Sequence, residues 1–223
     1  ADRDANVFSD YATDILGVPN NRIKTLVNVG ADEKGILLSI NNWLKRSITP
    51  GQSEIFIFFA GHGLASSDGE GMYLLPFDGY PSLLDKTAIL REELFSEIAS
   101  SNPKNVIVFL DTCYSGSTRD TNMLIASRPI AIIAKDKSIP DNFSVFTAAG
   151  GDQTAKPLEE AKHGMFSYFL MKGMEGDADS NMDNLITAGE LYDYVLKNVI
   201  QQSSGSQTPE LQGDATRVLV RFQ

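Results

Sequence analysis

The sequence predicts a single α/β domain. Two short apolar runs, residues 55–59 and 106–110, have the length and composition of strands buried on both faces of a parallel sheet. Segments with helical periodicity lie between and beyond them. The chain has 223 residues, of which 42% are hydrophobic, so it can bury one sizeable core.

Four periodic segments predict amphipathic helices, the second of which covers residues 31–47. Their expected inward faces are Phe8, Tyr11, Ala12 and Ile15; Leu37, Ile40 and Leu44; Leu90, Leu94 and Ile98; and Leu191, Tyr194, Val195 and Val199. A further helix is expected over residues 165–174. Besides the two central runs, we expect strands over residues 23–27, 72–75, 143–148 and 217–222. Helices and strands thus alternate along the whole chain, as in a sheet covered by helices.

Polar side chains follow both central strands. His62 stands between two glycines after the first strand, and Cys113, the only cysteine, follows the second. Because parallel strands end at the same edge of a sheet, the two side chains can meet there. A nucleophilic cysteine needs an imidazole nearby to take its proton. The pattern favours a Cys–His nucleophilic site; the alternative is that both residues are ordinary core residues.

The sequence motifs of these segments resemble those of the metacaspases and orthocaspases, which belong to the caspase-like cysteine peptidases. A His after one strand, followed about 50 residues later by a Cys after another, is the order found in caspases. Asp-Thr-Cys-Tyr-Ser-Gly at residues 111–116 replaces the Gln-Ala-Cys-x-Gly of animal caspases. Further similar motifs are residues 73–78, 151–154, 163–166 and 207–209. Together they extend over nearly the whole chain.

This resemblance implies a caspase-like three-layer α/β/α sandwich around a mostly parallel central sheet with an antiparallel edge strand. The single domain, residues 1–223, would comprise a large-subunit-like part (1–116), a loop open to processing (117–142) and a small-subunit-like part (143–223). Residues 217–222, with charges at alternating positions, suit an edge strand. The first strand of the family has no counterpart here, because residue 1 already corresponds to the start of the first helix.

The resemblance also implies a cysteine endopeptidase that cleaves after Arg or Lys. Cys113 would be the nucleophile and His62 its base, and the backbone N–H groups of Gly63 and Cys113 would form the oxyanion hole. Asp111 and Asp152 would line an acidic S1 pocket, since a carboxylate matches a guanidinium. The alternative for both aspartates is a turn-forming role.

His163 is the other histidine in the chain and therefore a rival base. It precedes an apolar helix instead of following a strand, and the family pattern gives a His-Gly pair there a structural role. No cofactor is required by this chemistry.

Residues 179–190 have the ligand spacing of a calcium-binding EF-hand loop. The candidate ligands are Asp179, Asn181, Asp183, the Leu185 carbonyl, Thr187 and Glu190. Asn184 stands where such loops have glycine, although Asn tolerates left-handed backbone. The alternative is that Thr187 and Glu190 form a capping box for the last helix. The acidic calcium site of metacaspases corresponds to residues 67–71, which carry only two acids.

Charge and composition limit the partners. The net charge of −10 argues against nucleic-acid binding, and no apolar run approaches the ~18 residues of a membrane helix. The polar, charged residues 1–6 do not resemble a signal peptide, so we expect a cytoplasmic location. We expect peptide or protein substrates with basic P1 residues, and either a monomer or a part of a larger polypeptide or complex.

Two other functions stay open. One is a catalytically idle caspase homologue that serves as an interaction or sensor module. The other is a CHAT- or separase-like peptidase of the same clan. Idle homologues usually lack the Cys or the His, and both are present here, which favours an active peptidase.

Overall fold

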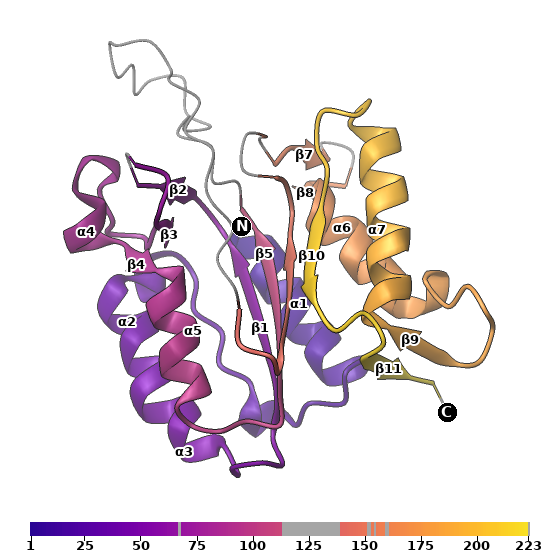
Figure 1. Cartoon of the computed structure of the whole chain (residues 1–223), viewed down its shortest axis with the longest axis horizontal. Coiled ribbons are helices and arrows are strands. Elements are labelled where there is room, and N and C mark those ends of the chain that lie inside the picture. Colours follow the sequence, from indigo (N-terminus) through magenta and orange to yellow (C-terminus); the bar gives the residue numbers. More distant parts are fainter. Residues whose placement is uncertain (67, 113–138, 151–152, 154, 159–160, 223) are drawn as a thin grey trace.

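The structure, a computed structural model, describes residues 1–66, 68–112, 139–150, 153, 155–158 and 161–222. Its central sheet has the strand order β1-β5-β6-β10. The strands β1 (Glu54–Ala60), β5 (Asn105–Asp111) and β6 (Phe143–Thr147) run parallel, and β10 (Glu210–Gly213) is antiparallel to β6. Helices cover both faces (Figure 1). The expected fold class, with an antiparallel edge strand, is confirmed.

Two helical layers enclose this sheet (Figure 1). One layer contains α2 (Glu33–Leu38), the π-helical η3 (Ser39–Leu44), α3 (Lys45–Ser47) and α5 (Arg91–Ala99). The other contains α1 (Asp2–Asp14), α6 (Met165–Lys172) and α7 (Ala188–Gln202). None of the helices in the described ranges has the length and apolar composition needed to cross a bilayer.

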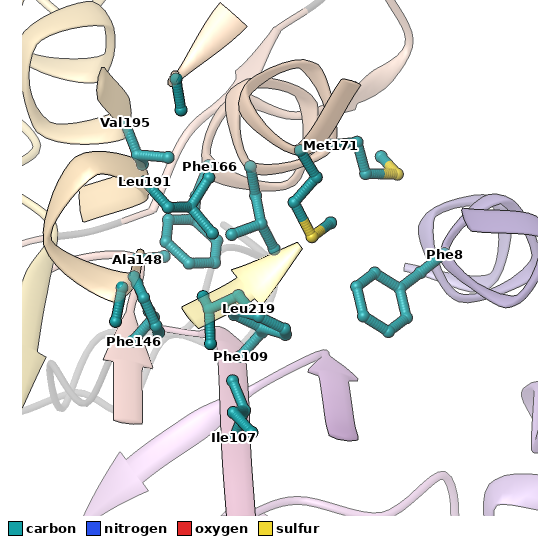
Figure 2. Close-up of a cluster of buried hydrophobic side chains, with 14 of the residues drawn as sticks. Phe8, Ile107, Phe109, Phe146, Ala148, Phe166, Met171, Leu191, Val195 and Leu219 are labelled. Atoms are coloured by element: carbon teal, nitrogen blue, oxygen red, sulfur yellow. The ribbon is translucent and has the colours of Figure 1, made fainter. Parts of the chain in front are cut away.

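The side chains of β5 alternate between two hydrophobic clusters, as the period of a strand requires. Val106, Val108 and Leu110 pack with α5, whereas Ile107 and Phe109 pack with α1, α6 and α7. Figure 2 shows the second cluster, in which Phe8, Phe109, Phe146, Phe166 and Leu191 converge from five elements. All seven residues of β5 except Asn105 are buried. This burial explains why the strand contains only apolar residues from Val106 to Leu110.

Smaller elements lie around the edges of the central sheet (Figure 1). Three short sheets are formed by β2 (Gly63–Ala65), β3 (Met72–Leu74) and β4 (Ile89–Leu90); β7 (Pro157–Leu158) and β8 (His163–Gly164); and β9 (Leu185–Thr187) and β11 (Val218–Arg221). The remaining helical turns are η1 (Asn20–Arg22), η2 (Asn28–Ala31), η4 (Pro81–Leu83), α4 (Leu84–Thr87) and the π-helical η5 (Gly173–Asp177).

The prediction that residues 217–222 close the central sheet is wrong. The edge strand is β10, and β11 pairs with β9 in a separate two-stranded sheet. The register of β11 shifts between Val218 and Val220, and its consecutive residues Leu219 and Val220 are both buried. Such an irregularity breaks the strict alternation on which the edge-strand prediction rested.

The predicted strand over residues 23–27 is also wrong. Its backbone is extended, with φ −107° and ψ 134° at Ile23 and φ −137° and ψ 149° at Val27. The segment nevertheless pairs with no strand within the described ranges. A strand exists only where a neighbour completes its hydrogen bonds, and local composition does not supply that neighbour.

The second predicted helix is present as the consecutive elements α2, η3 and α3, but one inward residue was misassigned. Leu37 is 38% exposed, while Ile36, Ile40 and Leu44 pack against the core. The π-helical turn of η3 takes more residues per turn than an α-helix. Residues four positions apart, here Ile36, Ile40 and Leu44, therefore stay on the buried face of the helix, and Leu37 lies outside that face.

Candidate active site

The carboxyl ends of β1 and β5 lie side by side, and the two predicted catalytic segments follow them in the sequence. The strands are in register from Glu54 opposite Asn105 to Ala60 opposite Asp111. Just beyond, the Gly61 N–H donates to the Asp111 carbonyl over 3.3 Å. His62, which follows Gly61, is exposed to solvent. Cys113 and Asp152 lie outside the described residues; the last described residue before Cys113 is the buried Thr112.

His62 and Gly63 lead directly from β1 into β2. The Leu75 N–H donates to the His62 carbonyl over 2.9 Å, and Gly63 pairs with Leu74 across the antiparallel ladder. Hydrogen-bonded and non-hydrogen-bonded pairs alternate in such a ladder. Since the His62–Leu75 pair is hydrogen-bonded, the Gly63 N–H faces away from β3. The ladder therefore fixes the direction of a backbone donor one residue after the imidazole.

Asp111 ends β5 as a buried carboxylate, with 4% of its surface exposed. The Ser167 hydroxyl, in the first turn of α6, donates to its Oδ2 over 2.5 Å. Gly164 lies against the same oxygen so closely that a Cβ at that position would overlap it. Burying a carboxylate costs free energy unless hydrogen bonds compensate, and Ser167 supplies one such bond.

His163 is held by a carboxylate for which the sequence suggested no function. Its Nδ1 lies 2.6 Å from Oδ1 of Asp4 on α1, and the side chains are 11% and 5% exposed. The contact between His163 and Asp4 connects β8 to the start of α1 and supports the structural role expected of His163.

The segment that contains Asp152 is bounded on both sides by hydrogen bonds to residues 207 and 208. The buried Gln207 donates to the Ala148 carbonyl over 2.9 Å and accepts from the Lys156 N–H over 2.8 Å. The Thr208 N–H donates to Oε1 of Gln153 over 2.6 Å. Gln207 and Thr208 of the Gln-Thr-Pro motif thus hold described residues on both sides of position 152, a role that the sequence alone did not reveal.

A family model for the caspase domain matches residues 1–220. The chain belongs to the caspase-domain family. No match was found among curated proteins. The match covers the described sheet and both central strand ends, and membership in this family supports a cysteine peptidase function for the caspase domain.

The candidate calcium loop of this caspase domain is a series of tight turns. Asp179 accepts the N–H groups of Asp183 and Asn184 over 3.2 and 3.0 Å, and Asp183 accepts that of Leu185 over 2.9 Å. Met182 and Asn184 have left-handed backbone, with φ 61° and 64°. These N–H groups use only part of the acceptor capacity of each carboxylate, which has about four lone-pair sites, so the turns are compatible with either interpretation of the loop.

The alternative reading of this loop, a capping box, is present. The Glu190 N–H donates to the Thr187 hydroxyl over 3.2 Å, and the Thr187 N–H donates to Oε2 of Glu190 over 3.0 Å. Within the described ranges, no group of three or more His, Cys, Asp or Glu side chains is arranged to hold a metal ion. Calcium binding by residues 179–190 stays a prediction.

Proposed function

We propose that this caspase domain is a cysteine endopeptidase of the metacaspase or orthocaspase type, which cleaves after Arg or Lys with a Cys113–His62 dyad. The observation that carries the proposal is the parallel register that ends at Ala60 and Asp111. His62 and Cys113 each follow these paired residues by two positions. A nucleophile and its base must lie close together, and the pairing of the two strand ends supports this assignment.

In the proposed reaction, His62 takes the proton of the Cys113 thiol, and the thiolate attacks the scissile carbonyl carbon. The carbonyl π electrons move to oxygen, where the N–H groups of Gly63 and Cys113 stabilise the negative charge. As the C–N bond breaks, the leaving amine takes the proton from the imidazolium and a thioester remains. Water, deprotonated by His62, then cleaves the thioester to release the acid and restore the thiol.

Specificity for basic P1 residues rests on Asp111 and Asp152. Asp111 is a buried carboxylate two residues before the nucleophile, so a side chain that reaches it leaves water. A cation there gains an ion pair in a poorly screened environment, whereas a P1 aspartate meets a like charge. Arg is favoured over Lys because its planar fork matches a carboxylate. The net charge of −10 favours cationic substrates in the same direction, although salt screens it beyond ~10 Å.

A panel of fluorogenic peptides that differ only at P1 tests this function. We expect hydrolysis of Arg and Lys peptides, no hydrolysis of Asp peptides, and no activity in a Cys113→Ala control. Preference for Asp at P1 would overturn the acidic-pocket assignment while leaving the dyad intact. A wild-type protein that hydrolyses none of the peptides, with or without added Ca²⁺, would favour the idle homologue instead.

Self-processing is a further part of the proposed function. Residues 117–142 contain four basic side chains at Arg119, Arg128, Lys135 and Lys137, and most of this stretch lies outside the described residues. An enzyme that cleaves after basic residues would find substrates there. Mass spectrometry of the wild type beside Cys113→Ala tests the proposal, since fragments that appear equally in both would come from another protease.

A further inference from the structure

We propose that Ser167 is a positioning residue for substrate specificity, whose hydroxyl holds the Asp111 carboxylate in the orientation that a basic P1 side chain requires. The inference rests on the proposed function, because it concerns the same S1 site. It adds a residue from a different part of the chain: Ser167 lies 56 positions from Asp111 and belongs to the helix α6.

The contact is short and excluded from solvent. The Ser167 Oγ lies 2.5 Å from Oδ2 of Asp111, and the two residues are 0% and 4% exposed. A hydrogen bond to a charged acceptor is roughly twice as strong as one between neutral groups, and burial removes the water that would otherwise compete for it. Loss of the hydroxyl would therefore leave the carboxylate without a bond that water does not readily replace.

The segment that carries Ser167 is itself fixed at several points. Gly164 lies directly against the same Asp111 oxygen, and the preceding residue, His163, is tied to Asp4. Met165 and Phe166 are 4% and 0% exposed within the hydrophobic cluster of Figure 2. One rigid segment thus limits the Asp111 side chain by a close backbone contact and by a directed hydrogen bond.

This arrangement affects arginine and lysine substrates differently. A guanidinium forms its best contact with a carboxylate when their planes are aligned, whereas an ammonium is a compact charge with little directional demand. Removing the bond from Ser167 takes away one of the contacts that orient the carboxylate while the carboxylate keeps its charge. Arg at P1 should then lose more than Lys, and the preference between the two should shrink.

The test compares Ser167→Ala with a matched buried control, Ser144→Ala. Ser144 on β6 is 0% exposed, and its hydroxyl has no hydrogen-bond partner within the described part of the chain. For Ser167→Ala we expect KM for an Arg-P1 peptide to rise about 10- to 100-fold, kcat to change much less, and the Arg-to-Lys ratio of kcat/KM to fall. Ser144→Ala should keep the wild-type KM and ratio.

Alkylation of Cys113 by iodoacetamide gives a readout that does not involve the S1 site. Its rate should be equal in wild type and Ser167→Ala, because the reagent carries no P1 side chain. If Ser167→Ala fails to fold, Ser167→Cys retains the volume with only a weak donor, and its KM should rise in the same direction. An unchanged KM, a loss confined to kcat, or an equal change in Ser144→Ala would overturn the proposal.

The wild type distinguishes this inference from the proposed function. If wild-type protein does not prefer basic P1 peptides, the proposed function fails and the role of Ser167 in specificity fails with it. If the wild type prefers them and Ser167→Ala retains its KM and its Arg-to-Lys ratio, the inference alone is wrong.

Discussion

Gly164 lies against the carboxylate of Asp111 so closely that any side chain at position 164 would overlap Oδ2. The two residues come from different elements, the end of β5 and the short strand β8. The absence of a Cβ at position 164 is therefore a condition for the buried position of the candidate specificity residue. This requirement is steric, since Gly164 has ordinary negative φ (−58°).

We expect Gly164→Ala to lower kcat/KM for basic P1 peptides by about 100-fold, because a displacement of Asp111 by about 1 Å is enough to misplace a bound group. Gly30→Ala is the matched control, since a Cβ there meets nothing within 4 Å and its φ is not positive. Kinetics and circular dichroism of both variants test this. Wild-type kcat/KM in Gly164→Ala would contradict the close contact.

Cys113→Ala should abolish peptide hydrolysis because it removes the nucleophile. His62→Ala should reduce hydrolysis by at least about 10²–10⁴-fold, the usual contribution of proton transfer by a side chain. His163→Ala should retain measurable turnover, because its imidazole contacts Asp4. Turnover with the Arg-P1 peptide and circular dichroism provide the comparison. If His62→Ala kept near wild-type turnover with a normal spectrum, the assigned base would be wrong.

Asp111→Ala should lose most hydrolysis of Arg-P1 and Lys-P1 peptides. Because the residue is buried, Asp111→Asn is the better variant: it keeps the volume and the acceptor for Ser167 but removes the charge. We expect it to fold and still to lose at least about tenfold in kcat/KM, equivalent to a single ion pair of about 1.4 kcal/mol. If kcat/KM were unchanged in both variants, Asp111 would not belong to the S1 pocket.

Alkaline pH should destabilise the fold through Tyr194. Burial and a hydrogen bond of 3.1 Å to Asp177 raise the pKa of Tyr194 to about 12. A raised pKa in the folded state stabilises the fold fully below the unfolded pKa of about 10, and this contribution is lost as pH rises toward 12. Denaturant unfolding across this window should therefore show a smaller loss in Tyr194→Phe than in wild type. Parallel pH profiles for the two proteins would exclude Tyr194 as a source.

Thr187→Ala should lower the free energy of unfolding by about 1 kcal/mol in buffer with a chelator, because it removes the N-cap of α7. Urea unfolding measures this. Thr216→Ala, which removes a hydroxyl contact with Asp214 on an exposed turn, should have a smaller effect. A rise in Tm on adding Ca²⁺ that disappears in Asp183→Ala would establish the EF-hand interpretation of the same loop.

The sequence by itself determined the central strands and the helices that bury one face. Residues 55–59 and 106–110 lie within β1 and β5, and Leu191, Val195 and Val199 are buried as their spacing predicts. These features are local: a period of two or of 3.6 can be read within a single segment. The same logic predicted that His62 and Cys113 follow neighbouring strands, because parallel strands end at one edge, and the strands that precede them are indeed paired.

Only the tertiary structure decided which strand closes the sheet and what surrounds Asp111. The partner of β11, the Ser167 hydroxyl and the Asp4–His163 pair depend on contacts between distant residues; Asp4 and His163 are 159 positions apart. Such contacts leave no periodic signal in either segment, because each partner alone is an ordinary polar residue. They form because burial makes an unpaired carboxylate or imidazole costly, and the folded chain determines which groups are near enough to satisfy it.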